Sequence, residues 1–178
     1  MDNEPKMHDS GKRQQFEGGA VRDTADGKPQ YNLISPFVWE FIQDEPEDKD
    51  DQNNTELILK TLGIDTSNYL LYRDIEHIKR AFKFMAEIYG TDRLCRWLEL
   101  GAQKYSRFNW TKGMPITRCL DSLGRHISKI KKTNEDHIAA IMCNLMFIIH
   151  YHECMKLKIS PDTWYDLWDF NKNQPAEI

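Results

Sequence analysis

The sequence predicts an all-α protein, a helical bundle with an extended N-terminal segment and disordered tails. Along four stretches between residues 74 and 153, apolar residues recur three and four positions apart, which is the spacing of one helix face. Residues that favour helix starts and stops flank these stretches. With 178 residues and 40% hydrophobic content, the chain is long enough for one compact domain with a core, and a second full domain is not expected.

Composition divides the chain into a domain and two tails. Residues 1–17 are polar, charged and aperiodic, so we expect a disordered tail that cannot offset the entropy of ordering. Residues 18–170 form the single domain, and the acidic segment 43–54 within it is expected to be a solvated loop. Glycine and proline punctuate residues 18–36, which predicts an extended or turning segment. Residues 171–178 are a polar tail.

The first half of the domain carries three helix starts. Ser35 followed by Pro36 predicts an N-cap and a first helical position. A short helix is expected over 55–63, and a stronger one over 74–90, where the final glycine is its stop. The buried stripe of the stronger helix is expected to be Ile75, Ile78, Phe82, Met85 and Ile88.

Four more helices are expected along the rest of the domain. Thr91 starts the first of them, and Pro115 opens the second, whose apolar residues form a bundle seam. Thr133 caps a long third helix, and the short connection before it predicts antiparallel packing. Ser160 and Pro161 start a last short helix that carries Trp164, Leu167 and Trp168 and covers the bundle or a neighbouring subunit. The seam is expected to be Ile116, Leu120, Leu123, Ile127 and Ile130.

Charge and cysteine content exclude several classes of protein. The net charge is -4 and the pI is about 5.9, which argues against extended nucleic-acid binding. Between residues 101 and 132, however, eight basic residues stand against one acidic residue, and this excess would attract a phosphate-bearing ligand. The four cysteines form no CxxC pair and indicate a reduced, cytoplasmic protein. No membrane span is expected, because Asn144 and His150 interrupt the longest apolar run.

The loop between residues 104 and 115 combines groups that could hold a nucleotide. Asn109, Trp110, Lys112 and Gly113 offer an amide, an aromatic face, a cation and backbone freedom. The alternative is a packed corner of the fold. Charged residues of the N-terminal segment could also lie across such a pocket.

The turn before the longest helix gathers acid and imidazole. Glu135, Asp136 and His137 are consecutive and follow His126 closely, so antiparallel helices would bring oxygen and nitrogen ligands together. Alternatively, the acids complement the helix macrodipole, and the histidines are ordinary core or boundary side chains. Asn144 lies two turns further along the helix, where a buried amide needs a partner that a ligand could supply.

Three motifs in order resemble a known family. They are GGAVRDTADGKP, GAQKYSRFNWTKG, and DSLGRH followed by NEDHIAAIMCNLMFIIH. Together they resemble the phage dATP/dGTP diphosphohydrolases, which are similar in character to the MazG-like all-α nucleotide pyrophosphohydrolases. The resemblance implies a phage protein in the host cytoplasm. It also implies cleavage of a purine deoxynucleoside triphosphate to monophosphate and pyrophosphate with Mg²⁺ or Mn²⁺.

The resemblance also implies roles for individual residues. Catalytic residues are expected to be Glu135, Asp136, His126 and His137. Metal ligands are expected to be Glu135 and Asp136, with Glu99 or Asp121. Substrate-binding residues are expected to be Lys104, Lys112 and Arg125 at the phosphates, Tyr105, Asn109 and Trp110 at the base, Asn144 behind them, and Arg22 and Lys28 from the N-terminal segment.

One departure from the MazG-like pattern leaves alternatives open. Those enzymes carry an EExxE set answered by ExxD on the next helix, whereas Glu99 stands alone here and Glu135 adjoins Asp136. The chain is therefore expected to be either a pyrophosphohydrolase or a non-catalytic nucleotide-sequestering protein. A third possibility is an interaction module that inhibits a host system. Helical pyrophosphohydrolases tend to complete their sites across subunits, so a homo-oligomer is expected.

Overall fold

The protein is all-α, as the sequence predicts. A computed structural model describes residues 12–15, 17–23, 27–41, 75–130, 132–160, 168–169 and 174–175. Its α-helices are α2 (Ile75–Tyr89), α3 (Asp92–Tyr105), α4 (Ile116–Lys129) and α5 (His137–Lys156). The predicted acidic loop 43–54 and the predicted helix over 55–63 lie outside the described residues, as do Trp164 and Leu167.

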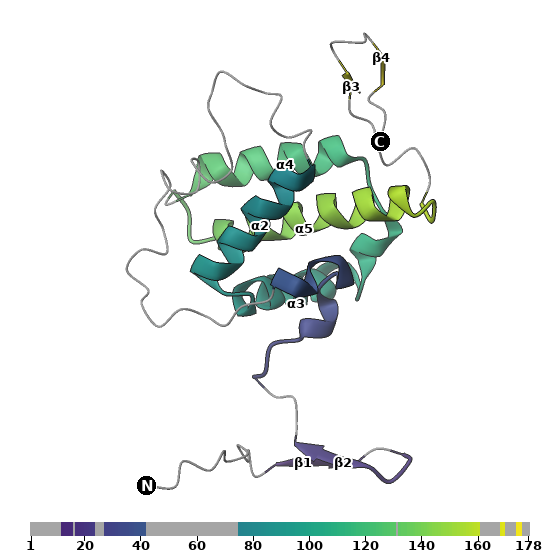
Figure 1. The fold of residues 1–178 in the computed structure, drawn as a ribbon. Coiled ribbons are helices and arrows are strands. Elements are labelled where there is room, and N and C mark those ends of the chain that lie inside the picture. Colours follow the sequence, from purple (N-terminus) through teal and green to yellow (C-terminus); the bar gives the residue numbers. More distant parts are fainter. Residues whose placement is uncertain are drawn as a thin grey trace, which may run out of the picture.

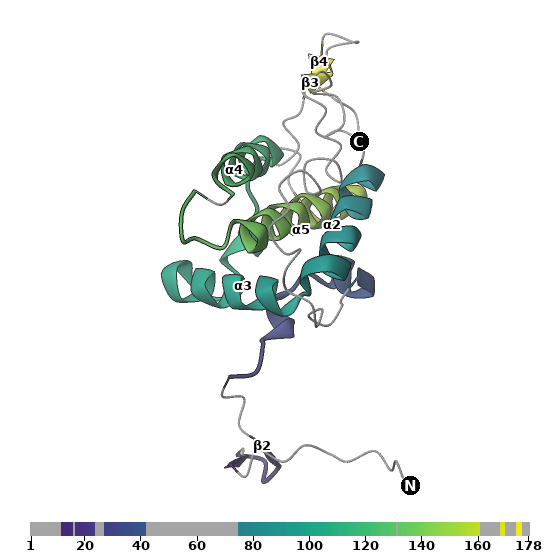
Figure 2. The ribbon, with the colours of Figure 1, turned by 90° about the vertical axis from the view of Figure 1, so that its left-hand side faces the viewer.

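Helix α5 is the centre of the fold. It lies between α4 on one side and α2 and α3 on the other (Figures 1 and 2). Fifteen of its 20 residues are buried, so its apolar residues face neighbours all round. By length and composition it could cross a membrane, but 78% of its most apolar window is buried inside the protein. This burial is that of a core helix.

Helices α4 and α5 pack antiparallel, which confirms the prediction from their short connection. The last turn of α4 contacts the first turn of α5. The seam of α4 packs against the core, with Ile116, Cys119 and Leu123 buried and Leu120 and Ile127 partly buried. Because this seam is satisfied within the chain, it gives no support to a homo-oligomer, which stays a prediction.

Helices α2 and α3 meet at Gly90, as the helix-stop and helix-start residues predict. Gly90 has φ +70°, a conformation that glycine adopts without strain. Thr91 directly precedes α3 and is fully buried. The two helices therefore form a corner, and both pack against α5.

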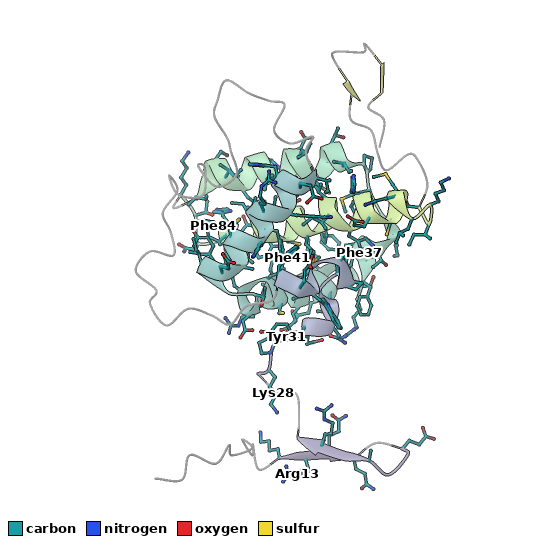
Figure 3. The ribbon with its side chains drawn as sticks, viewed as in Figure 1. Arg13, Lys28, Tyr31, Phe37, Phe41 and Phe84 are labelled. Carbon is teal, nitrogen blue, oxygen red and sulfur yellow. The ribbon has the colours of Figure 1, made fainter. Side chains whose placement is uncertain are left out.

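The N-terminal segment crosses the helices as two 3₁₀ turns. These are η1 (Tyr31–Leu33) and η2 (Pro36–Phe41). The predicted start at Ser35 is confirmed, since its hydroxyl accepts a hydrogen bond from the Phe37 amide at 3.3 Å. In Figure 3, Tyr31 lies against the helices, whereas Lys28 lies on the connection that leads away from them.

Short strands replace parts of both predicted tails. Strand β1 (Arg13–Gln15) pairs antiparallel with β2 (Val21–Asp23), apart from the helices in Figure 1. Gly19, at φ +85°, allows the intervening turn, and residues 13–15 form a strand that the sequence does not predict. The predicted helix containing Trp168 is also wrong at that residue. Strand β3 (Trp168–Asp169) instead pairs antiparallel with β4 (Gln174–Pro175). The helix-start residues Ser160 and Pro161 do not predict this pairing.

The cap of α5 differs from the prediction by three residues. Asp136, rather than Thr133, caps the helix, and its Oδ1 accepts a hydrogen bond from the Ala139 amide at 3.0 Å. The hydroxyl of Thr133 instead contacts Nε2 of His137 at 2.6 Å. Helix α5 consequently begins at His137, which places this imidazole in the first turn.

Candidate functional site

Two histidines from successive helices meet at the turn between α4 and α5. His126 lies in the last turn of α4, and His137 is the first residue of α5. Their Nδ1 atoms are 3.0 Å apart. The side chain of His137 is only 3% exposed and that of His126 is 17% exposed. The convergence of imidazoles that the sequence predicts is therefore present in the fold.

Glu135 adds a carboxylate to the two histidines. Its Oε2 lies 3.5 Å from Nδ1 of His137 and 4.0 Å from Nδ1 of His126. The Glu135 side chain is 45% exposed, so the group opens to solvent on this side. We call His126, Glu135 and His137 the imidazole–carboxylate cluster. Its ligand-type atoms all lie within 4.8 Å of one another, close enough to share one cation.

Thr133 contacts the far side of the His137 ring. Its Oγ1 lies 2.6 Å from Nε2 of His137 and accepts a weaker hydrogen bond from the Glu135 amide at 3.4 Å. When the hydroxyl accepts from Nε2–H, the ring keeps its lone pair on Nδ1, facing the cluster. Thr133 therefore suits a role in orienting the imidazole.

Burial favours the neutral form of His126. Desolvation lowers its pKa below the ordinary value, although the nearby negative charge of Glu135 acts in the opposite direction. Trp97 packs edge-on against the ring, with centroids 6.0 Å apart and planes at 87°. A neutral imidazole has a free lone pair, which is the form that binds a metal ion.

The donor set fits a divalent cation. Two imidazole nitrogens with one carboxylate oxygen are a recurrent ligand combination for divalent transition ions. The exposed side of Glu135 leaves room for water or a substrate oxygen. His126, Glu135 and His137 are therefore the described residues that would hold a metal ion here.

Asp136 is occupied by structural contacts. Its Oδ1 caps α5, and its Oδ2 accepts a hydrogen bond from Nε of Arg93 at 2.8 Å. The Arg93 guanidinium also lies over the Tyr89 ring, 5.9 Å from its centroid. Asp136 therefore joins the turn to α3 and fixes the position of the cluster, whereas its predicted metal ligation stays a prediction.

A pocket of about 360 Å³ opens between α3, η1, α5 and the loop that follows α3. Its lining is mostly apolar and aromatic, with Gly101 and Ala102 leaving space on the helix side. Trp110 is held firmly, because it stacks on Phe147 at 5.7 Å and its carbonyl accepts a hydrogen bond from the Tyr151 hydroxyl at 2.7 Å. The aromatic residues that line the pocket are Trp97, Tyr105, Phe108, Trp110 and Phe147.

The loop over this pocket has strained backbone angles, and side-chain hydrogen bonds hold it in place. Ser106 and Phe108 have φ angles of +128° and +56°, in the region that non-glycine residues rarely adopt. Asn109, within η4 (Asn109–Lys112), accepts a hydrogen bond from Nζ of Lys112 at 3.1 Å. Arg107 donates to the side chain of Gln30 at 2.8 Å. Strain of this kind gathers at ligand sites, where the surrounding contacts hold the backbone in place.

The pocket and the imidazole–carboxylate cluster share one wall. Trp97 lines the pocket and also packs against the ring of His126. Lys104, which is fully exposed near the end of α3, lies in the field of Glu135. Contact with Tyr105 and the charge of Glu135 both raise the pKa of Lys104. A ligand could therefore occupy the pocket with one end and reach the cluster with the other.

Three other predicted residues of the helices, Glu99, Asp121 and Asn144, are not members of the imidazole–carboxylate cluster. Glu99 accepts a hydrogen bond from the Gln30 amide at 2.8 Å and so ties α3 to the N-terminal segment. Asp121 and Arg125 lie on the exposed face of α4, and Asp121 is not part of the imidazole–carboxylate cluster. Asn144 is buried, and its amide donates one hydrogen bond to the Ala140 carbonyl at 2.7 Å, within its own helix. Its predicted role behind the substrate stays a prediction.

The two predicted N-terminal cations lie away from the pocket lining. Arg22 belongs to strand β2, and Lys28 lies between β2 and η1; both are exposed. Figure 3 places Lys28 between the helices and the β1–β2 hairpin. Their predicted contact with substrate stays a prediction.

Sequence reasoning overlooked Trp97 and Thr133 as members of the site. Trp97 has the spacing of a core residue. The neighbouring sequence does not show whether such a residue only packs in the core or also lines a pocket. Thr133 has the signal of a helix cap. The available clue was its position four residues before His137, which matters only once the turn geometry is known.

Comparison with known proteins supports the resemblance seen in the sequence. Residues 88–160, which include α3, α4 and α5, match the family model described as dATP/dGTP diphosphohydrolase, N-terminal. A protein of Salmonella phage PMBT28 named dATP/dGTP diphosphohydrolase is 38% identical over 65 residues, covering 33% of this chain and 22% of the relative. The chain thus spans about a fifth of that relative's length. No solved structure matches significantly. The predicted resemblance to the phage family is confirmed, whereas its MazG-like character stays a prediction.

Proposed function

We propose that the chain hydrolyses a purine deoxynucleoside triphosphate with a divalent metal ion. The premise is that residues 88–160 match the N-terminal family model of the dATP/dGTP diphosphohydrolases. The products would be the monophosphate and pyrophosphate. One observation carries the proposal. Trp97 belongs to the wall of the pocket and also packs against His126, a member of the cluster that can hold a cation.

The pocket suits the base and sugar rather than the whole nucleotide. Its volume of about 360 Å³ is near the lower end of ligand pockets, which span roughly 300–1,000 Å³. Stacking of a base on an aromatic ring contributes about 1–3 kcal/mol to binding. Tyr105 and Trp110 offer such rings, and Asn109 offers an amide that can hydrogen-bond to a base edge.

The triphosphate would then lie outside the pocket, toward the imidazole–carboxylate cluster. Lys104, Lys112 and Arg125 are exposed cations, and Lys104 lies in the field of Glu135. Such cations would neutralise the phosphates, because they remain charged at neutral pH. We assign them to the phosphates as the sequence predicts.

Hydrolysis would join a water oxygen to one of the two phosphorus atoms that share the cleaved bridge, and the bridging oxygen would leave with the other. When bound, a divalent ion would polarise the phosphate oxygens and neutralise their charge. His126, Glu135 and His137 would hold that ion. Asp136 would keep the turn in place through its cap and its contact with Arg93.

The direct test is a product assay on the purified chain. We expect dGTP and dATP to be converted to dGMP and dAMP, with release of pyrophosphate, in the presence of Mg²⁺ or Mn²⁺, measured by ion-exchange chromatography. His126→Ala should remove the activity, and Glu87→Gln, at an exposed position on α2, should leave it unchanged. If every nucleotide survives intact with both metals, the enzymatic proposal is abandoned.

Nucleotide binding without turnover is a second candidate. It is favoured by the presence of one carboxylate in the cluster, since the neighbouring carboxylate of Asp136 is already bonded to Ala139 and Arg93. This candidate predicts retained nucleotide without product, detected by calorimetry or as co-purified ligand. Lys112→Ala and Arg125→Ala should weaken such binding.

A further inference from the structure

We propose that the imidazole–carboxylate cluster is a selective site for a divalent transition ion, which it binds without nucleotide and in preference to Mg²⁺. This deepens the proposed function, on which the catalytic role of the ion rests. Binding of the ion itself can be tested without any substrate. The proposal stands on donor type, on the distances between donors, and on the contacts that hold them.

Donor type separates the candidate ions. Mg²⁺ prefers oxygen ligands and keeps several of its waters, so two imidazole nitrogens are a poor set for it. Imidazole suits iron, cobalt, nickel and zinc, and affinity for one site rises from Mn²⁺ through Co²⁺ toward Cu²⁺. His126 and His137 supply two of the three donors of this cluster. Its chemistry therefore favours the later transition ions.

The distances between donors fit one shared ion. Two atoms that each lie ~2.1 Å from an ion are ~3.0 Å apart at a right angle and ~4.2 Å apart when opposite. The three separations in the cluster are 3.0, 3.5 and 4.0 Å. All three fall within that range, so small side-chain rotations would suffice to bind an ion.

Surrounding contacts hold both rings in place before an ion arrives. Thr133 contacts Nε2 of His137, a ring that is 3% exposed, and Trp97 packs against His126. A metal-bound histidine usually gives its second N–H to an oxygen of this kind, and loss of that partner costs ~10–100-fold in affinity. The half-exposed Glu135 completes the site from the solvent side.

The competing explanation is a proton shared by the two histidines. In that case Nδ1–H of one ring donates to Nδ1 of the other, and Glu135 interacts only with their charge. Such a pair would have no use for an ion and no preference among metals. Metal titration separates the two explanations.

The experiment uses the full chain, stripped with a chelator and titrated separately with Co²⁺, Mn²⁺ and Mg²⁺. Calorimetry gives affinity and stoichiometry, and the visible spectrum of Co²⁺ reports nitrogen ligation. We expect one Co²⁺ per chain, weaker Mn²⁺, and Mg²⁺ weaker than Co²⁺ by at least ~100-fold. Equal affinity for Mg²⁺ and Co²⁺, or no Co²⁺ binding by the folded chain at millimolar concentration, would overturn the proposal.

Matched variants locate the ion. Glu135→Gln and His126→Ala should abolish the Co²⁺ spectrum while circular dichroism still shows a folded helical protein. Thr133→Val should weaken Co²⁺ binding by ~10–100-fold, and Thr133→Ser should restore it. Thr111→Val is the control. The exposed Thr111 hydroxyl that it removes donates to the Phe108 carbonyl, its one contact among the described residues. Co²⁺ affinity that is unchanged in both folded cluster variants would place the ion elsewhere and overturn the assignment.

The result is independent of hydrolysis. Selective Co²⁺ binding without any nucleotide cleavage would support this site and count against the proposed enzyme. Cleavage that depends on Mg²⁺ alone, and that persists in His126→Ala, would support an enzyme whose catalytic ion lies outside this site.

Discussion

The two ends of α5 both carry histidines, but their ring nitrogens have different partners. At the N-terminal end, two Nδ1 atoms face each other at 3.0 Å beside the carboxylate of Glu135. Toward the C-terminal end, Nδ1 of His150 contacts the Ser35 hydroxyl at 3.0 Å, and its Nε2 contacts the Cys154 thiol at 3.3 Å. Both nitrogens of His150 are therefore satisfied by neutral protein groups.

The surroundings of the two ends differ as well. Aromatic rings enclose His150, including Phe37 at 5.4 Å and Trp110 at 4.7 Å between centroids. The imidazole–carboxylate cluster has an aromatic wall on one side and the half-exposed Glu135 on the other. A histidine that is enclosed and fully partnered stabilises a fold, whereas two that share a carboxylate at the surface can bind a ligand. The predictions below test this distinction.

The largest expected effect is on chemistry at the N-terminal end. His126→Ala should reduce kcat/KM for dGTP by at least ~100-fold, because loss of a general acid–base group or metal ligand costs about this much. Helix content measured by circular dichroism should stay unchanged. Retention of full activity would show that the cluster does not take part in hydrolysis.

The next effect is on stability at the C-terminal end. His150→Ala should lower the free energy of unfolding by roughly 2–4 kcal/mol, since it opens a cavity and removes a partner of Ser35. Urea unfolding measures the change. Co²⁺ affinity of the remaining folded protein should match that of the unmodified chain, and a loss of Co²⁺ binding would contradict a purely structural role.

A smaller effect is expected at Asp136, which the sequence assigns to catalysis. Asp136→Ala should cost about 1–2 kcal/mol of stability through loss of the α5 cap. Asp136→Asn should cost less, because asparagine caps a helix nearly as well. Urea unfolding and the product assay together decide the matter. Abolished hydrolysis in a stable Asp136→Asn protein would restore its catalytic assignment.

The smallest effect is the pH dependence of stability. Burial lowers the pKa of His150 below its ordinary value of about 6.5. The unfolded chain therefore gains a proton at a higher pH than the folded chain does. Stability should be fully present above that value and fall as pH decreases below it, by up to ~1.4 kcal/mol per pH unit for one group.

The measurement is urea unfolding between about pH 5 and pH 8. His150→Gln should reduce the slope on the acid side, although His126 and His152, whose pKa values burial also lowers, keep part of it. An unchanged slope in this variant would show that His150 is not protonated on unfolding in this range.

Sequence reasoning predicts the helices well because their signals are local. Periodic apolar residues and the glycine at position 90 predict α2, α3 and α4, and the predicted starts agree with the observed ones to within one residue. It fails at residues 13–15 and at Trp168, which form strands. Each strand pairs antiparallel with another short strand a few residues further along the chain, and no apolar alternation in the sequence predicts these pairings.

The candidate site follows the same division. Tyr105, Asn109 and Trp110, which the resemblance assigns to the base, line one pocket. Glu99 and Asp121, which the resemblance offers as metal ligands, are not part of the cluster. A resemblance in sequence names residues but does not fix where their side chains point. The sequence does not show that the buried amide of Asn144 donates to the Ala140 carbonyl of its own helix.

The sequence by itself determined the helical class, the order of the helices and the kinds of groups available for nucleotide chemistry. These depend on periodicity and residue type, which neighbouring residues decide. Only the tertiary structure decided that Asp136 caps α5 while Glu135 faces two imidazoles, and that Trp97 joins the pocket to them. The reason is geometric, because the angle of one turn determines which of two adjacent carboxylates points toward the histidines.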